Sequence, residues 1–141
     1  MACDTQMTHY SGMKLKGISK ILELPEDICK DMFDCKQALI GFAGSTASWG
    51  AVVQYFAFYE EAKLPKLREI ELLILTNKKE ILSTTDLLTY TKIDAPFFSI
   101  GTGMHYAIGA MAAGKTPKEA CMIASKYDPM TGMGYKEYHI T

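Results

Sequence analysis

Residues 97–128 read FFSIGTGMHYAIGAMAAGKTPKEACMIASKYD. The apolar run 97–100 predicts a short strand, and the glycines of 101–103 predict a tight turn after it. Small and apolar residues then predict a helix over 104–113, which ends at Gly114 because glycine is favoured just past a helix end. We therefore expect a strand, a turn and a helix, followed by a second helix.

The second helix is expected to start at Thr116-Pro117-Lys118-Glu119 and to run to about Tyr127. Threonine caps such a helix, proline suits its first position, and glutamate completes a capping box. Residues 109–116, GAMAAGKT, also match the phosphate-loop pattern G-x-x-x-x-G-K-[ST] letter for letter. That loop needs a strand that ends at its first glycine. Because a helix is predicted there instead, nucleotide binding is a distant third hypothesis.

Hydrophobic periodicity outlines the rest of the chain. A helix is expected from Ser45, with Ser45 or Thr46 as its cap, to about Lys63, and Pro25 at an N1-like position marks a short helix or an inserted loop. Strands are expected before a turn at Ser11-Gly12 and over 14–24, 37–44, 70–76, 80–83, 87–93 and 135–140, with 77–79 as a hairpin turn. Strands and helices come in runs, which favours a layered α+β sandwich over a parallel βαβ sheet. We expect a single domain over residues 1–141.

Composition limits the classes of function. The 141 residues are 48% apolar and 22% charged, and their formal net charge is −1. This excludes a disordered chain, and no apolar run reaches the ~18 residues of a membrane span. Nucleic-acid binding is not expected, because no basic block stands out to neutralise phosphates. The sequence is that of a soluble globular protein, by default in the cytoplasm.

The cysteines predict neither a zinc site nor a disulfide framework. Cys3, Cys29, Cys35 and Cys121 form no C-x-x-C pair, and the three histidines are scattered singly. A structural zinc site needs tight Cys/His pairs. The first residues lack the basic and apolar regions of a signal peptide, so free thiols in a reducing compartment are expected. No metal or cofactor is predicted.

Four segments, taken in order, carry a family resemblance. They are ACDTQMT at 2–8, KGISKI at 16–21, LIGFAGSTA at 39–47 and the stretch 97–128. Together they resemble the proteasome β-subunit and the bacterial HslV peptidase, which are N-terminal-nucleophile hydrolases. The resemblance implies a four-layer αββα sandwich. It also implies six site residues: Asp4, Lys20, Gly44, Thr102, Asp128 and Thr131.

The chemistry of that family gives the first three residues their implied roles. A threonine hydroxyl at the chain's own N-terminus attacks the peptide carbonyl, and its α-amine serves as general base. Lys20 lies sixteen residues after Asp4, which is the family spacing; its cation would favour deprotonation of the nucleophile, and Asp4 would hold it by a charge-assisted hydrogen bond. The Gly44 amide would stabilise the oxyanion.

The remaining three residues would orient the amine. Thr102 stands where the family usually has serine, and Asp128-Pro-Met-Thr131-Gly is similar to the proteasomal D-x-x-S-G segment. Simpler interpretations exist for single residues: Asp4 and Lys20 as solvated surface charges, Thr102 as a helix N-cap, and Asp128 as part of a helix stop. Gly44 has one too, as a turn glycine. The joint order of the six favours the family fold and leaves activity open.

The nucleophile is not among residues 1–141. By the family spacing it would lie roughly a dozen residues before Met1, on a first strand that is missing here. Three hypotheses compete: the strand is encoded upstream, the chain is a shortened inactive relative, or removal of Met1 and Ala2 exposes Cys3 as a misplaced nucleophile. The missing strand is normally central in its sheet, so its loss would leave unpaired backbone that a partner or a rearranged fold must cover.

The leading hypothesis is a proteasome/HslV-like, threonine-peptidase-type subunit. The resemblance implies assembly into homo-oligomeric rings and hydrolysis of unfolded polypeptide delivered by a partner ATPase unfoldase. The rival is a catalytically inactive structural or assembly protein on the same scaffold, for example in a phage virion. Whether the chain is an enzyme is open at this point.

Overall fold

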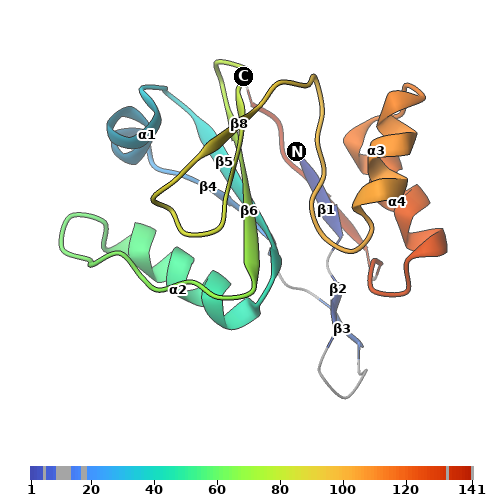
Figure 1. Cartoon of the computed structure of the whole chain (residues 1–141), viewed down its shortest axis with the longest axis horizontal. Coiled ribbons are helices and arrows are strands. Elements are labelled where there is room, and N and C mark those ends of the chain that lie inside the picture. The colour runs from blue at the N-terminus through green and yellow to red at the C-terminus, as the bar shows by residue number, and fades with distance from the viewer. Residues whose placement is uncertain (5, 9–13, 17–18, 133, 141) are drawn as a thin grey trace. The chain divides into compact units, whose positions relative to one another are not determined.

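The computed structural model describes residues 1–4, 6–8, 14–16, 19–132 and 134–140 (Figure 1). The chain divides into two compact units. Unit 1 contains residues 1–21 and 97–139, and unit 2 contains residues 22–96 together with the C-terminal end. That the two units form one domain stays a prediction. No helix within the described ranges is both long and apolar enough to cross a bilayer.

Unit 2 is built on a five-stranded sheet with the strand order β4-β5-β6-β7-β8. The strands are β4 (Ile21–Glu23), β5 (Ala38–Gly44), β6 (Ile70–Thr76), β7 (Ile81–Thr84) and β8 (Thr91–Ile93). Strands β5 and β6 pair antiparallel over their full length, from Ala38 opposite Thr76 to Gly44 opposite Ile70. The predicted hairpin is confirmed, because β6 and β7 pair antiparallel around the turn at 77–79.

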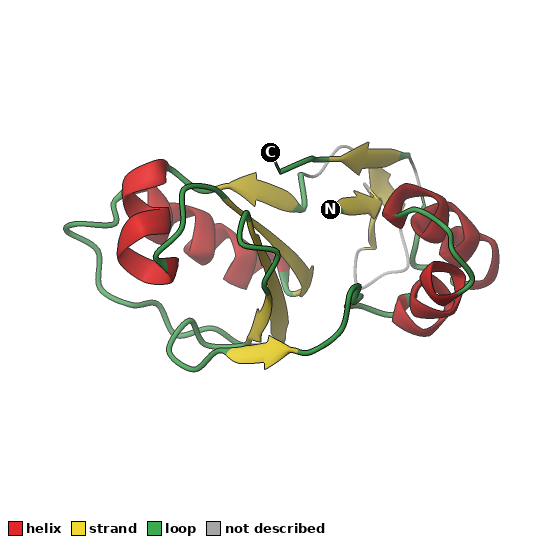
Figure 2. Cartoon of the chain, turned by 90° about the horizontal axis from the view of Figure 1, so that it is seen from above, coloured by secondary structure: helices red, strands yellow, loops and turns green. Residues whose placement is uncertain are grey.

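Two helices cover one face of this sheet, α1 (Glu26–Phe33) and α2 (Thr46–Ala57) (Figure 2). Side chains of β5 and β6 point to alternate faces, as the strand period of two requires. One set of alternate side chains therefore joins the helices in the main core. Its fully buried members include Ala38, Ile40, Val52, Leu72 and Ile74.

Helix α1 resolves the choice between a short helix and an inserted loop. Pro25 occupies the N-cap position, with φ −56° and ψ 149°, and not the first helical position that the sequence predicts. Proline restricts its own φ but allows this extended ψ, so it precedes the helix instead of entering it. At the other end Asp34 adopts the left-handed conformation, and its amide donates to the Lys30 carbonyl, which is the αL end motif, while the Cys35 amide donates to the Cys29 carbonyl.

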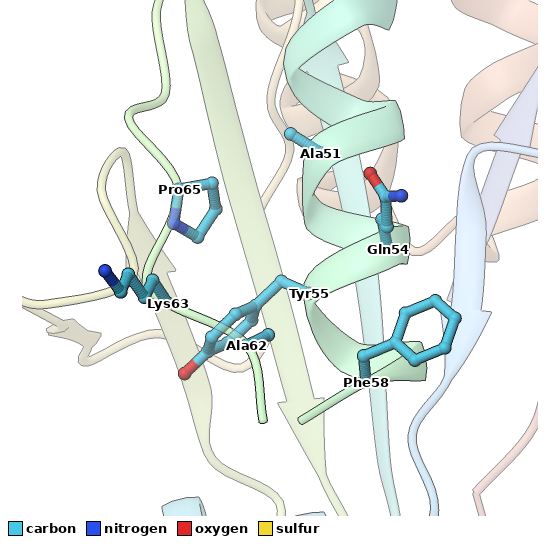
Figure 3. Close-up of a pocket in the computed structure, with 7 residues that line it drawn as sticks. All are labelled: Ala51, Gln54, Tyr55, Phe58, Ala62, Lys63 and Pro65. Carbon is cyan, nitrogen blue, oxygen red and sulfur yellow. The ribbon is translucent and has the colours of Figure 1, made fainter. Parts of the chain in front are cut away.

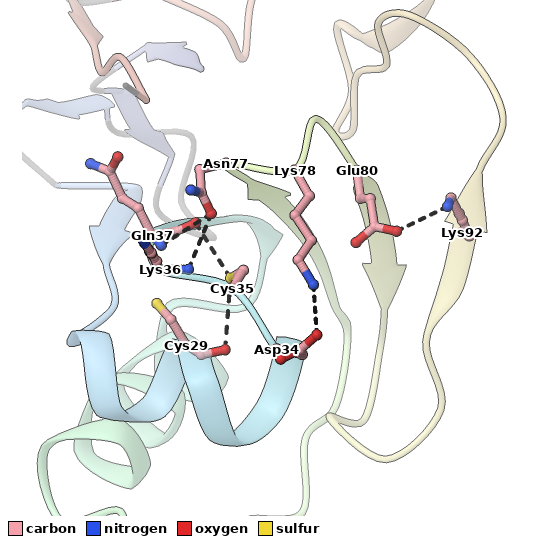
Figure 4. A network of polar contacts seen from close by, with 9 residues as sticks. All are labelled: Cys29, Asp34, Cys35, Lys36, Gln37, Asn77, Lys78, Glu80 and Lys92. Carbon is pink, nitrogen blue, oxygen red and sulfur yellow. Dashed lines mark hydrogen bonds and ion pairs between the residues drawn. The ribbon is translucent and has the colours of Figure 1, made fainter.

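A polar cluster ties the end of α1 to the hairpin turn (Figure 4). Asn77 Oδ1 accepts from the amides of Lys36 and Gln37 at 3.2 and 3.3 Å, and the Asn77 amide donates to the Gln37 carbonyl at 2.9 Å. The Lys78–Asp34 ion pair at 2.8 Å is exposed to solvent, where screening by water leaves such pairs with little effect on stability. The asparagine therefore does more than the ion pair to fix the loop against the hairpin.

Helix α2 is shorter than predicted. Ser45 is its N-cap and accepts from the Ser48 amide, as expected, but the helix ends at Ala57 and not near Lys63. Two glutamates follow at 60–61, and acidic side chains are disfavoured at a helix C-terminus, where the backbone dipole is negative.

Several strand predictions need correction. In place of the predicted strand 14–24 the structure has Lys14–Lys16 and Ile21–Glu23, which belong to different sheets, and only Tyr135–Glu137 of the predicted strand 135–140 is a strand. Only residues 91–93 of the predicted strand 87–93 are extended, because the side chains of Thr84 and Asp86 accept the amides of residues 86–89 and fold them into a turn. Leu87 adopts φ 63° in that turn. Residues 97–100 form no strand, since among the described residues no segment pairs with them.

Unit 1 contains two strand pairs and a helical hairpin. Strand β1 (Ala2–Asp4) pairs antiparallel with β9 (Tyr135–Glu137), and β2 (Gln6–Thr8) pairs antiparallel with β3 (Lys14–Lys16). Helices α3 (Met104–Ala112) and α4 (Pro117–Tyr127) pack together through four buried alanines. Helix α4 also contacts β1 and β9. The turn predicted at Ser11-Gly12 lies outside the described residues.

The cap predicted for α4 is confirmed. Thr116 Oγ1 accepts from the Glu119 amide at 3.2 Å, and Glu119 Oε2 accepts from the Thr116 amide at 2.8 Å. Residues 109–112 lie inside α3, so the phosphate-loop lookalike has a helix where that loop needs the end of a strand.

Gly44 provides a test of the backbone at the end of β5. It has φ +109°, and a Cβ there would lie 2.1 Å from the Glu69 carbonyl oxygen. We expect Gly44→Ala to lower the free energy of unfolding by about 2–4 kcal/mol, because strain and overlap with backbone add. The matched control is Gly50→Ala, inside α2, where a Cβ meets nothing within 4 Å and helix propensity gains about 0.5–1 kcal/mol. Equal urea midpoints for both variants would contradict this account.

Cys29 makes stability depend on pH. Burial raises the pKa of its thiol from 9.0 to about 11. In the unfolded chain the thiol ionises near its ordinary pKa, so the stability that depends on its proton is present below pH 9 and is lost as pH rises toward about 11. Between pH 8 and 10 urea denaturation should show a loss of about 1 kcal/mol that is absent in Cys29→Ala. Parallel pH profiles for the two proteins would exclude this thiol as the cause.

Candidate functional site

Asp4 and Lys20 form a largely buried ion pair in unit 1. Asp4 ends β1, Lys20 directly precedes β4, and Lys20 Nζ donates to Asp4 Oδ1 at 2.8 Å. Only 12% of the aspartate side chain and 18% of the lysine side chain are exposed. The simpler interpretation of these residues as solvated surface charges is therefore excluded.

A second cluster forms around the Asp128 carboxylate. Asp128 is the C-cap of α4 and is 7% exposed. Its Oδ2 accepts from Thr102 Oγ1 at 2.5 Å and from Thr131 Oγ1 at 2.7 Å, while its Oδ1 accepts from the Met130 amide at 3.0 Å. The N-cap of α3 is Gly103 and not Thr102, so the Thr102 hydroxyl serves the carboxylate and not the helix.

One backbone amide joins the two clusters. Gly132 directly follows Thr131, and its N–H donates to Asp4 Oδ2 at 2.9 Å. The Asp4 carboxylate thus binds Lys20 with one oxygen and the segment after Asp128 with the other. Five of the six predicted site residues belong to this connected network, which lies entirely within unit 1.

The sixth residue, Gly44, lies in unit 2. It ends β5, is exposed, and precedes Ser45, whose amide donates to the Glu69 carbonyl at 2.7 Å. The positive φ of Gly44 shows why glycine is needed at this turn. Its role as an oxyanion donor stays a prediction.

Sequence reasoning missed two residues of the network's surroundings, Gln6 and Gly103. Gln6 is 3% exposed, and its Nε2 donates to the Pro129 carbonyl at 2.9 Å. A Cβ on Gly103 would lie 2.9 Å from Thr131 Oγ1 and 3.2 Å from Asp128 Oδ2. A polar residue two positions after Asp4 on an expected strand was the one available signal for Gln6.

Two thiols lie close enough to interact electrostatically with the ion pair. Burial raises the pKa of Cys3, partly opposed by a hydrogen bond from the Lys20 backbone and by the lysine charge. Burial, with a smaller effect of the neighbouring Cys3 thiol, raises the pKa of Cys121 to about 12. Because the thiolate is the nucleophilic form, these shifts weigh against Cys3 as a replacement nucleophile.

A surface pocket of about 290 Å³ lies elsewhere, in unit 2 (Figure 3). It is formed by one face of α2 and the segment after it, with Tyr55 and Phe58 as its aromatic walls and Gln54 and Lys63 as its polar residues. None of the six predicted site residues lines it. The network of unit 1, and not this pocket, therefore combines the carboxylate, ammonium and hydroxyl groups that acid–base chemistry needs.

The network combines a fixed cation with a hydroxyl-bearing carboxylate cluster. A buried ammonium held by a carboxylate lowers the cost of negative charge on a neighbouring oxygen. Two hydroxyls bound to one carboxylate oxygen form a rigid acceptor site beside it. These are the parts needed to activate a nucleophile and to orient an amine.

Solved structures with the same fold were found by comparison. HslV from Trypanosoma brucei matches with a TM-score of 0.66 and 18% identity over 96% of this chain and 88% of that chain. Thiobacillus denitrificans BPH in complex with epoxomicin matches with a TM-score of 0.62 and 17% identity over 96% and 88%. Anbu (ancestral β-subunit) from Yersinia bercovieri matches with a TM-score of 0.66 and 11% identity over 95% and 73%.

These likenesses confirm the predicted α+β fold of the proteasome β-subunit and HslV type. At such low identities they establish the fold alone. No family model matches the sequence, and no curated protein matches it significantly.

Gly103 tests how tightly the carboxylate cluster is packed. In Gly103→Ala the new Cβ must displace Thr131 Oγ1 or Asp128, so we expect a loss of about 1–3 kcal/mol of unfolding free energy. The matched control is Gly109→Ala in α3, where a Cβ meets nothing within 4 Å and stability should rise by about 0.5–1 kcal/mol. Thermal unfolding measures both, and a Gly103→Ala protein as stable as its control would argue against a closely packed cluster.

Proposed function

We propose that this chain is a proteasome/HslV-like subunit and that unit 1 carries the framework of a threonine-type peptidase site. The supporting observation is the continuous network from Lys20 through Asp4 and the Gly132 amide to the cluster of Thr131, Asp128 and Thr102. Single polar contacts are common in any fold. Five residues singled out by their order in the sequence, joined in one network, are much less expected by chance.

In the proposed mechanism Lys20 stays charged because Asp4 holds it. Its field favours the alkoxide of a threonine hydroxyl that attacks the substrate carbonyl, while a free α-amine takes the proton. The amine would be oriented by the Thr102–Asp128–Thr131 cluster, and the Gly44 amide would donate to the oxyanion. The mechanism requires a threonine with a free α-amine, which residues 1–141 would receive from a preceding strand.

The proposal extends to architecture and partners. The layers would be those of a four-layer αββα sandwich, with helices covering one face of each sheet. We further propose a homo-oligomeric ring that takes unfolded polypeptide from a partner ATPase. The fold shared with HslV and Anbu supports this assembly, and the epoxomicin complex of BPH supports a ligand site on the same fold.

An alternative, structural function is favoured because the carboxylate oxygens of the network are already hydrogen-bonded within the chain. Both Asp4 oxygens and both Asp128 oxygens already accept hydrogen bonds from within the chain. A network so complete also serves as a purely structural link between β1, α4 and the turn before α3. An inactive structural or assembly subunit, for example in a phage virion, is therefore the alternative function.

The activity test uses the protein made from its own gene with the upstream DNA intact. The peptidase hypothesis expects an in-frame threonine-bearing strand before the Met1 codon and hydrolysis of a fluorogenic peptide. Lys20→Ala should then lower kcat by about 100-fold or more, because the fixed cation is lost. The matched control, Lys118→Ala on the exposed side of α4, should keep full activity.

Two results would decide between the two functions, and a third would test the site assignment alone. A stop codon next to Met1, or a folded wild-type protein without hydrolysis, would leave the structural role. Full hydrolysis by Lys20→Ala would overturn the site assignment while keeping the peptidase.

A further inference from the structure

We propose that Gln6 is a positioning residue that, together with Asp4, fixes the segment 128–132 and so sets Thr131 and Asp128 in register with the Asp4–Lys20 pair. The predicted effect of Gln6 on catalysis rests on the proposed function. The predicted effect of Gln6 on the position of the segment 128–132 rests only on hydrogen bonds within unit 1.

The first observation is the burial of Gln6. A glutamine at the start of β2 with 3% exposure has lost its water, so its amide must be matched within the protein. Its Nε2 donates to the Pro129 carbonyl at 2.9 Å. Removing that donor would leave the Pro129 carbonyl without this hydrogen bond, and the segment 128–132 without one of its contacts to β2.

The second observation is the closeness of the glutamine's other amide atom to Gly132. A Cβ built on Gly132 would lie 3.3 Å from Gln6 Oε1, which is tighter than ordinary van der Waals contact. The Gln6 amide therefore spans from Pro129 to Gly132. A side chain at position 132 would require Gln6 Oε1 to give way by a few tenths of an ångström.

The third observation is that Asp4 holds the same segment at its other end. The Gly132 amide donates to Asp4 Oδ2 at 2.9 Å, so the segment is held at the carbonyl of 129 and at the amide of 132. Thr131 lies between these two points, and its amide donates to the Asp128 carbonyl at 3.1 Å. A shift of the Thr131 backbone away from Asp128 would therefore strain or break at least one of these two hydrogen bonds.

The segment can thus be moved without touching any proposed catalytic residue. Gln6→Met keeps the length and volume of the side chain but removes the donor. We expect amide hydrogen exchange at Gly132 to accelerate by about 10–100-fold, because one of two anchors is lost. The side-chain NMR signals of Thr131 should shift at the same time.

Thr116→Ala is the matched control for general destabilisation. It removes the capping box of α4 and so destabilises the end of the helix that is remote in sequence from the segment 128–132. It should speed exchange in the first turn of α4 and leave the Gly132 amide and the Thr131 signals unchanged. Equal effects of both variants at Gly132, or no effect of Gln6→Met, would overturn the proposal.

A second variant keeps the test valid if Gln6→Met does not fold. Gly132→Ala leaves the glutamine in place but crowds its Oε1, and it also strains the backbone next to Thr131, because Gly132 has φ +154°. Both effects disturb the segment 128–132, so a shift of the Thr131 signals is expected. Unchanged Thr131 signals in this variant would equally contradict the positioning role.

Activity provides the readout that separates this inference from the proposed function. In hydrolysing protein, Gln6→Met should lower kcat by about 10–100-fold with KM unchanged, because positioning affects the reacting groups and not substrate binding. If wild-type protein does not hydrolyse peptides, the proposed function fails. The hydrogen-exchange and NMR results would still test whether Gln6 positions the segment 128–132. A KM increase at constant kcat would overturn the positioning role.

Discussion

The two oxygens of Asp4 hold unit 1 together at its polar centre. One accepts from the Lys20 ammonium and the other from the Gly132 amide, and the side chain is only 12% exposed. Such a buried pair is weak evidence for stability, since desolvation offsets much of its attraction, but loss of one partner is costly. Lys20 and Gly132, which bind the buried Asp4 carboxylate, are therefore constrained in position, and Lys20 also in its charge. Through these two contacts Asp4 connects β1 to the residue before β4 and to the segment after α4.

Local chemistry made most of the secondary structure predictable. The cap of α4, the hairpin of β6 and β7 and the apolar strand β5 depend on residues close together in the sequence, and each was found where expected. Two of the wrong strand predictions have causes that the pattern of apolar residues does not reveal: side chains that bind backbone amides, and the lack of a neighbouring strand to pair with. Side chains of Thr84 and Asp86 captured backbone amides of an expected strand, and residues 97–100 had no ladder partner among the described residues.

The site was predictable only as far as the family pattern extends. Order and spacing identified Asp4, Lys20 and the cluster at Asp128, and the structure brings these together. Spacing cannot reveal Gln6 or Gly103, because their importance arises from atoms that approach them after folding. What a glutamine does here depends on a carbonyl more than a hundred residues away in the sequence.

The paired hydroxyls on Asp128 also give the site a direction. A hydroxyl has one proton, and Thr102 and Thr131 both direct theirs to the same carboxylate oxygen. Toward any third group they can therefore act only as acceptors, backed by the charge of the carboxylate. If unit 1 has the proposed function, this cluster would favour N–H groups and protonated amines over carboxylates, and so the amino end of a chain over its carboxyl end.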